Sequence, residues 1–275
     1  MPEGPEIRRA ADLVASALKG HTAVTVEFGL ERLAHHGERL SGRRIDAVEA
    51  RGKALLLHFS GGESVYTHNQ LYGRWRVGAA GARPASSRSL RLAIDTRTTS
   101  ALLYSASDIE VSTPAALAEH PYIARLGVEL LAPETELEEV FTQVSAPRHA
   151  GRSLGALLLD QGFLAGLGNY LRSEILFVAR LTPALRPRDL SDAERAALAN
   201  AALELTRQSY RTGGITNDLT RAAALKRRRL SFGRYRHHVF DREGEPCWVC
   251  ATPVRRIVAA GRNLFLCPRC QSPRD

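Results

Sequence analysis

The chain contains four cysteines, arranged as two Cys-x₂-Cys pairs close to its C-terminal end, Cys247 with Cys250 and Cys267 with Cys270. Sixteen residues separate the pairs. Because each pair can present two thiolates to one side of a tetrahedral metal ion, this spacing predicts a zinc site. Four sulfur ligands leave no open coordination position, so we expect one structural Zn²⁺ with no catalytic part. A disulfide pair or a redox-active pair is the alternative.

The segment between the cysteine pairs is expected to form a hairpin. Apolar runs at 254–259 and 263–266 flank Ala260-Gly261-Arg262, which has the composition of a turn. Arg262 would then lie at the tip of the hairpin, where it would meet whatever the finger docks on.

The N-terminal half of the chain is expected to begin with a helix and to continue as a set of strands. Apolar residues recur at helical spacing from Pro5 until Gly20. Short apolar or alternating runs with Gly-rich breaks then predict an antiparallel sandwich or barrel. These runs are 22–28, 44–51, 53–59, 64–68, 74–77, 90–95, 101–104 and 109–112.

The pattern becomes helical after Pro121, with amphipathic stretches at 136–144, 153–161, 170–179 and 191–209. A loop rich in Gly, Thr and Arg is expected at about 211–229. We therefore predict a two-domain α+β chain with a small C-terminal appendage. Its segments are a β domain at 1–124, a helical domain at 125–235 and a zinc finger at 236–275.

The charge of the chain suggests a polyanionic partner. The formal net charge is +9, and between Arg207 and Arg242 ten Lys or Arg residues face only two acids. An excess of this size is typical of nucleic-acid-binding proteins, although a basic enzyme without such a partner is the alternative. No apolar run approaches the roughly 20 residues that a membrane span needs, and the opening residues do not resemble a secretory signal. We therefore expect neither a membrane nor a secreted protein.

Pro2 and Glu3 offer nucleophilic chemistry if Met1 is removed. Pro2 would then be a free secondary amine, and an α-amino group titrates near neutral pH, so a useful fraction is nucleophilic. Attack on a sugar C1′ would give a cationic iminium, an electron sink, and Glu3 could donate or accept a proton. On the residues alone, an ordinary N-terminus is the simpler interpretation.

Several motifs together resemble those of the Fpg/Nei family of DNA glycosylase/AP lyases. They are the opening Pro2-Glu3-Gly4-Pro5-Glu6-Ile7, Arg51-Gly52-Lys53, Gly166-Leu167-Gly168-Asn169-Tyr170 and the four-cysteine finger. The resemblance covers nearly the whole chain in the same order, and stretches 66–73 and 103–110 are most similar to the bacterial endonuclease VIII branch, which removes oxidised pyrimidines. It implies an antiparallel β-sandwich with an N-terminal helix, then a helical domain with a helix–two-turn–helix unit at about 153–179.

The resemblance also implies a role for individual residues. Pro2 would attack C1′ of a flipped nucleotide, Glu3 would be the general acid/base, and Lys53 would donate a proton during β-elimination. Arg262 would assist δ-elimination and, with Asn169, hold phosphates that flank the lesion. The remaining DNA contacts would be Arg125 and the residues that fill the gap left by the extruded base, Gln70, Leu71 and Tyr72.

The implied partner is damaged double-stranded DNA, bound by a monomer in the bacterial cytoplasm at the nucleoid, without a small-molecule cofactor. One alternative is a purine-directed glycosylase of the same family, which removes formamidopyrimidines and 8-oxoguanine. That branch typically begins Pro-Glu-Leu-Pro-Glu and uses a methionine as gap filler, whereas this chain has Gly4 and no Met besides Met1. Two further alternatives are a non-catalytic damaged-DNA-binding protein and a zinc-finger transcription factor, although the finger shows no recognition helix.

Overall fold

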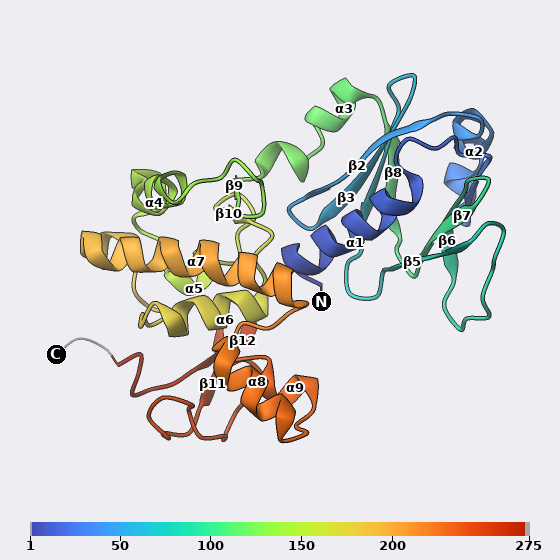
Figure 1. Cartoon of the computed structure of the whole chain (residues 1–275). Coiled ribbons are helices and arrows are strands. Elements are labelled where there is room, and N and C mark those ends of the chain that lie inside the picture. The colour runs from blue at the N-terminus through green and yellow to red at the C-terminus, as the bar shows by residue number, and fades with distance from the viewer. Residues whose placement is uncertain (1, 273–275) are drawn as a thin grey trace. The chain divides into compact units, whose positions relative to one another are not determined.

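The computed structural model describes residues 2–272, so Met1 and the last three residues lie outside it. The chain divides into two units, Met1–Arg125 and Leu126–Asp275, which are described separately (Figure 1). The segment predicted as the finger lies within the second of these units. Within the described residues, no helix is both long and apolar enough to cross a membrane.

The first unit is built on two antiparallel four-stranded sheets, with strand orders β1-β6-β7-β5 and β2-β3-β4-β8. Apolar side chains from both sheets form one core, which confirms the predicted sandwich. The strands are β1 Thr25–Phe28, β2 Ile45–Arg51, β3 Ala54–Phe59, β4 Ser64–His68, β5 Arg74–Ala79, β6 Leu90–Asp95, β7 Thr99–Tyr104 and β8 Asp108–Ser112.

Helix α1 (Gly4–Leu18) places its apolar stripe in that core, through residues such as Ile7, Val14 and Leu18. The unit also contains α2 (Ala34–Leu40), α3 (Pro114–Ala118) and the 3₁₀ turns η1 (Glu31–Leu33) and η2 (Ile123–Arg125). The sequence interpretation missed α2, which is short and contains Gly37. A Cβ at Gly37 would lie 2.6 Å from the Val26 carbonyl oxygen, so the glycine permits close packing against β1.

The second unit is mainly helical and has its own apolar core (Figure 1). Its elements are β9 Val128–Glu129, α4 Leu137–Ser145, η3 Pro147–His149, α5 Leu154–Leu157, β10 Leu164–Ala165, α6 Asn169–Val178, η4 Pro187–Asp189, α7 Asp192–Thr212, α8 Leu219–Arg227, α9 Phe232–Tyr235, β11 Arg255–Ala259 and β12 Arg262–Leu266.

Two predictions for this unit, one of a helix and one of a loop, differ from the structure. The helix expected at 153–161 ends at Leu157, and Asp160 then turns the chain by accepting a bond from the Gly162 N–H at 2.9 Å. The prediction of a loop at 211–229 is wrong, because α7 continues to Thr212 and α8 occupies 219–227. Asp218 starts α8 by accepting a bond from the Arg221 N–H at 2.7 Å, an N-terminal signal that the basic composition concealed.

Candidate active site

The predicted nucleophile and its neighbouring acid lie at the start of α1. Pro2 is half-buried, and Glu3 immediately precedes the helix with only 3% of its surface exposed. The Glu3 N–H donates to Glu6 Oε2 at 2.9 Å, which fixes the backbone at this helix end. A buried carboxyl next to Pro2 is well placed for proton transfer at this position. Met1, whose removal the proposed chemistry requires, lies outside the described residues.

Lys53 lies in the turn between β2 and β3, in the same unit. The strands pair up to Arg51 and Ala54, so Gly52 and Lys53 form the turn, and Gly52 has the positive φ of +57° that favours glycine. The Lys53 N–H donates to the Tyr122 hydroxyl at 2.7 Å. Lys53 is only 7% exposed, so it is not the water-facing charge that its sequence context alone suggests.

The three predicted gap-filling residues lie in the turn between β4 and β5. Leu71 is 55% exposed and Tyr72 is 69% exposed, an unusual exposure for large apolar side chains. Gln70 has a φ of +50°, and its N–H donates to His68 Nδ1 at 3.0 Å. Its side-chain oxygen accepts a bond from the Ser107 hydroxyl. On the sequence alone, Leu71 and Tyr72 would be assigned to the core, and the structure contradicts that assignment.

Asn169 and the finger hairpin meet in the second unit. Asn169 begins α6, and its Nδ2 donates to the Asn263 carbonyl at 2.7 Å. Arg262, the preceding residue, is exposed and opens β12. Ala260 and Gly261 both have positive φ, so they form the two-residue turn of the hairpin, with Arg262 directly after it. The expected hairpin is thus present, with Arg262 one residue beyond its tip.

Arg172 joins these elements and was not found from the sequence. Its guanidinium is fully buried and donates to carbonyl oxygens of α5 and of the hairpin, and to Asn169 Oδ1 at 2.6 Å. The carbonyl partners are Gly155 at 2.9 Å, Ala259 at 3.0 Å and Asn263 at 3.2 Å. An arginine on a helix is ordinarily exposed, so the sequence of α6 did not indicate this burial.

Glu174 holds the segment that leads into the finger. Its carboxylate is fully buried and accepts bonds from three backbone N–H groups, those of His238, Val239 and Phe240, at 2.7–2.9 Å. The Thr216 hydroxyl adds a fourth bond at 2.6 Å. Burial opposes ionisation, but the nearby imidazoles and these hydrogen bonds hold the pKa of Glu174 below its ordinary value. Helix α6 therefore binds the finger through both a buried cation and a buried anion.

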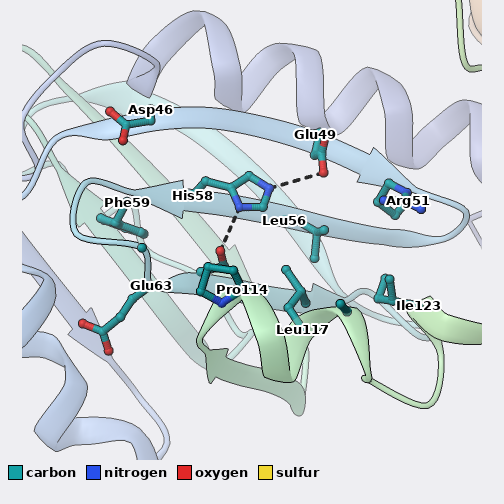
Figure 2. Close-up of a pocket in the computed structure, with 13 residues that line it drawn as sticks. Asp46, Glu49, Arg51, Leu56, His58, Phe59, Glu63, Pro114, Leu117 and Ile123 are labelled. Atoms are coloured by element: carbon teal, nitrogen blue, oxygen red, sulfur yellow. Dashed lines mark hydrogen bonds and ion pairs between the residues drawn. The ribbon is translucent and has the colours of Figure 1, made fainter.

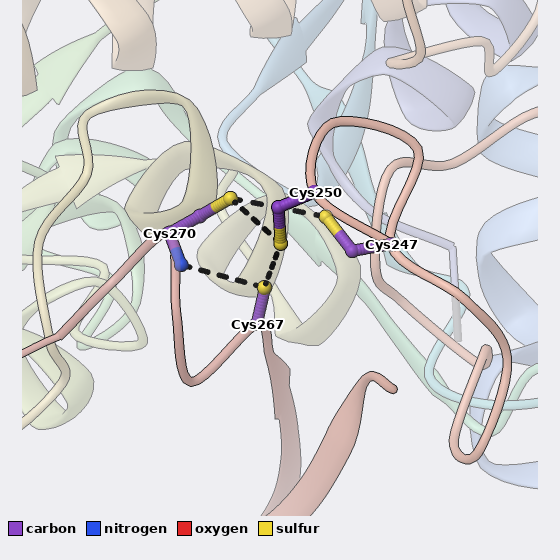
Figure 3. A group of neighbouring side chains, drawn as sticks. All are labelled: Cys247, Cys250, Cys267 and Cys270. Carbon is purple, nitrogen blue, oxygen red and sulfur yellow. Dashed lines mark hydrogen bonds between the residues drawn. The ribbon is translucent and has the colours of Figure 1, made fainter. Parts of the chain in front are cut away.

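The four cysteines come together as predicted (Figure 3). Their sulfurs lie within 4.8 Å of one another, including 3.4 Å between Cys250 and Cys267 and 3.9 Å between Cys247 and Cys270. A tetrahedral zinc with Zn–S bonds of about 2.3 Å needs sulfurs roughly 3.8 Å apart. Burial raises the pKa of Cys270 to about 12, so this thiol needs a cation nearby to ionise. The residues fit one structural zinc ion.

Arg125 and the basic run are exposed cations. Arg125 ends η2 and donates through Nε to the Pro121 carbonyl. The four consecutive cations 226–229 are all exposed, at the end of α8 and just after it. Exposed cations of this kind can contact phosphates. Pro2, Glu3, Lys53, Gln70, Leu71, Tyr72 and Arg125 lie in the first unit, whereas Asn169, Arg262 and the four cysteines lie in the second.

Comparison with known families gives three matches along the chain. The formamidopyrimidine-DNA glycosylase N-terminal domain matches residues 1–106. The formamidopyrimidine-DNA glycosylase H2TH domain matches residues 126–220, and the zinc finger found in FPG and IleRS matches residues 244–273. The matches therefore include both units and the finger.

Individual proteins are similar over the full length. The chain is 45% identical to Endonuclease 8 of Escherichia coli O17:K52:H18 and 43% identical to Endonuclease 8 of Klebsiella pneumoniae, in each case over 98% of this chain and 100% of the relative. It is also similar to the crystal structure of the MutM (Fpg) protein from Thermus thermophilus. That match has 29% identity and a TM-score of 0.79 and covers 100% of both chains.

Proposed function

The chain belongs to the Fpg/Nei family of DNA glycosylase/AP lyases, which act in base excision repair, and from this premise we propose that it removes oxidised pyrimidines from duplex DNA. The observation that carries this proposal is the high identity with the two Endonuclease 8 proteins over the whole chain. The absence of any methionine besides Met1 also supports it, because the purine-directed branch typically uses one as gap filler.

The first step is extrusion of the damaged nucleotide. A base stacked in duplex DNA does not expose its C1′ to a nucleophile, so the nucleotide must rotate out and the gap must be filled. Leu71 and Tyr72 suit this role, because they are large, apolar and exposed on one turn. Gln70 is tied to His68 and Ser107, so the base of the turn is held while its tip stays exposed.

The chemical steps fall to Pro2, Glu3 and Lys53. The Pro2 nitrogen displaces the base from C1′, and the base leaves with a proton that Glu3 supplies. The amine then loses its proton and the C1′–O4′ bond breaks, with a proton delivered to O4′, which opens the sugar ring and gives the iminium. This iminium acidifies the neighbouring C2′ position. Loss of that C2′ proton expels the 3′ phosphate, and a second elimination expels the 5′ phosphate. Lys53 donates a proton during the first elimination and holds a phosphate, and Arg262 assists the second. Water then releases Pro2 from the sugar fragment.

The remaining contacts position the DNA backbone. Asn169 lies at the N-terminus of α6, where backbone N–H groups attract phosphates, and Arg262 lies on the hairpin bonded to it. Arg125 adds a further cation. The zinc ion keeps the finger folded, and the closed four-sulfur site gives it no part in the reaction. We propose a monomer that acts on damaged duplex DNA in the bacterial cytoplasm, at the nucleoid.

Excision from two matched duplexes tests the lesion class. One duplex would contain dihydrouracil and the other 8-oxoguanine at the same position, and single-turnover rates of base release would be compared. The proposal predicts faster release of dihydrouracil. Faster release of 8-oxoguanine would instead identify a purine-directed glycosylase, and damage-dependent binding without release of either base would identify a non-catalytic binding protein.

A further inference from the structure

A hollow in the first unit has none of the residues given a role above in its lining. It has a volume of about 440 Å³ and lies over β2, β3 and β4, beside α3 and η2 (Figure 2). Cavities that hold small organic ligands start at about 300 Å³. Successive side chains of each strand point to opposite faces of the sheet, and the hollow lies on the face opposite the sandwich core. Leu56 and His58 face the hollow, whereas their neighbours Leu55 and Leu57 belong to the core between the sheets.

A polar network crosses three adjacent strands within the hollow (Figure 2). His58 Nδ1 lies 2.8 Å from the Ser64 hydroxyl oxygen, and His58 Nε2 lies 3.3 Å from Glu49 Oε1. His58 and Ser64 are direct cross-strand partners, and Ser64 is buried, which fixes the imidazole from one side. The hydrogen bond with His58 lowers the pKa of Glu49, so this carboxylate is ionised at neutral pH.

Carboxylates dominate the charge of the lining. Asp46 and Glu63 line the hollow together with Glu49, and each also binds an arginine that is not part of the lining. Arg44 binds Asp46 at 2.7 Å, and Arg39 binds Glu63. Glu49 contacts the His58 ring, Arg51 and Arg8 also lower the pKa of its carboxyl, and 47% of its side chain is exposed. An anion such as a DNA phosphate is therefore disfavoured here, although the chain as a whole is strongly basic.

An apolar surface lies beside these carboxylates. Leu56 and Leu117 are buried at its base and belong to a small cluster under α3. Pro114 and Ile123 extend the surface on either side of Leu117 (Figure 2). Arg51, at the last position of β2, also lines the hollow. The hollow thus combines an apolar wall with an ionised carboxylate, the combination that suits an amphipathic cation.

We propose that this hollow binds a small organic cation, a protonated primary amine on an apolar body about the size of one aromatic ring. The ammonium group would bind Glu49, and the apolar body would lie over Leu56 and Leu117. The assignment rests on the lining alone and is independent of the lesion class proposed above.

The test uses two probes of similar size and opposite charge, 2-phenylethylammonium and 3-phenylpropionate, with the zinc-loaded full chain. Titrations followed by ¹H–¹⁵N spectra would show saturable binding of the ammonium at least tenfold tighter than that of the carboxylate, with shifts confined to β2, β3 and α3. Glu49→Gln would weaken ammonium binding about tenfold, because it removes a charge-assisted hydrogen bond. Glu38→Gln, at an exposed glutamate outside the lining, would leave it unchanged.

A second variant tests the hollow itself. Ala118 lies at its exposed margin, so Ala118→Phe would obstruct entry without disturbing a buried position, and an unchanged melting temperature would verify the fold. This variant should abolish ammonium binding. The proposal is overturned if the two probes bind equally, if the Glu49 and Glu38 variants bind alike, or if no saturable binding appears up to about 10 mM, the weak limit for fragments of this size.

Discussion

The Nη2 atom of Arg172 lies 2.6 Å from Oδ1 of Asn169, one turn earlier on α6. A guanidinium is only a donor, so this contact fixes which end of the Asn169 amide is oxygen. The Nδ2 group must then point toward the finger, where it donates to the Asn263 carbonyl at 2.7 Å. The residue proposed to bind phosphate from α6 and the strand that begins with Arg262 are therefore held by one buried cation.

The Arg172→Met variant tests this arrangement. Loss of the guanidinium removes a donor from the Gly155 and Ala259 carbonyls and from Asn169 Oδ1, and we expect the free energy of unfolding to fall by about 3 kcal/mol. DNA nicking should fall at least tenfold even where the variant is fully folded, because the hairpin is no longer fixed beside Asn169. Urea unfolding and single-turnover nicking would measure both effects.

The matched control for that variant is Arg188→Met. Arg188 is an exposed arginine of the same unit, with 57% of its side chain accessible, and its replacement should change stability by less than about 0.5 kcal/mol. If folded Arg172→Met protein nicks DNA at the same rate as this control, Arg172 does not position the hairpin beside Asn169.

Leu71→Ala and Tyr72→Ala should separate function from stability. Both side chains are more than half exposed, so melting temperatures should change by little. Excision from duplex DNA should nevertheless fall at least tenfold, because the gap left by the flipped nucleotide is not filled. Leu13→Ala, at a 48% exposed leucine on α1, is the control. Equal rates of excision by the Tyr72 and Leu13 variants would contradict the gap-filling role of Tyr72.

Removal of zinc should inactivate the enzyme while the first unit stays folded. Cys267 is fully buried, and the zinc site holds the loops on both sides of the β11–β12 hairpin. Strand β12 of this hairpin begins at Arg262. Treatment with a chelator should abolish nicking, release one zinc ion per chain and leave the apolar core between the two sheets intact. Trp75 is buried in that core, and its fluorescence, recorded in a Trp248→Phe background because Trp248 lies beside the zinc ligand Cys247, would show whether the core persists. Full nicking by the zinc-free protein would contradict this account.

The second unit should lose stability as the pH falls below neutral. Burial lowers the pKa of His237 to about 4, whereas the unfolded chain protonates this residue near 6.5. The unfolded state therefore binds more protons between these two values, and the free energy of unfolding falls as the pH drops through this window, by about 3 kcal/mol in all. His237 Nδ1 lies 2.9 Å from the Thr216 hydroxyl oxygen.

The His237→Asn variant is the comparison, because its amide can occupy the place of Nδ1 but does not titrate. Urea unfolding at pH 7, 6, 5 and 4 should show a shallower decline for this variant. Parallel curves for the two proteins would assign the decline to other groups, such as Glu174 or the zinc ligands.

The sequence predicted those features that depend on local spacing. Two Cys-x₂-Cys pairs at this separation predict a zinc site from spacing alone. The alternation of apolar residues along the first 112 positions predicted the strands within a few residues. The gap-filling role of Leu71 and Tyr72 was predicted only from the family resemblance. Their exposure depends on the turn between β4 and β5 that carries them, and the sequence does not show this.

The features that the sequence concealed depend on tertiary contacts. Arg172 and Glu174 are charged residues two positions apart on α6, and neither shows by its spacing that it is buried and hydrogen-bonded to the finger. Helix α8 was missed because its basic composition suggested a solvated loop, although Asp218 marks its start. Composition describes the surface that a segment presents and does not decide whether the backbone is ordered.

The most direct test of the central claim is borohydride trapping on a duplex that contains one dihydrouracil, followed by peptide mass mapping of the adduct. Borohydride reduces an imine between the enzyme and the sugar to a stable bond, so the labelled residue is the nucleophile. We predict a covalent adduct at the nitrogen of Pro2, in protein that has lost Met1. An adduct at a lysine, or DNA cleavage without any adduct, would contradict the role of Pro2.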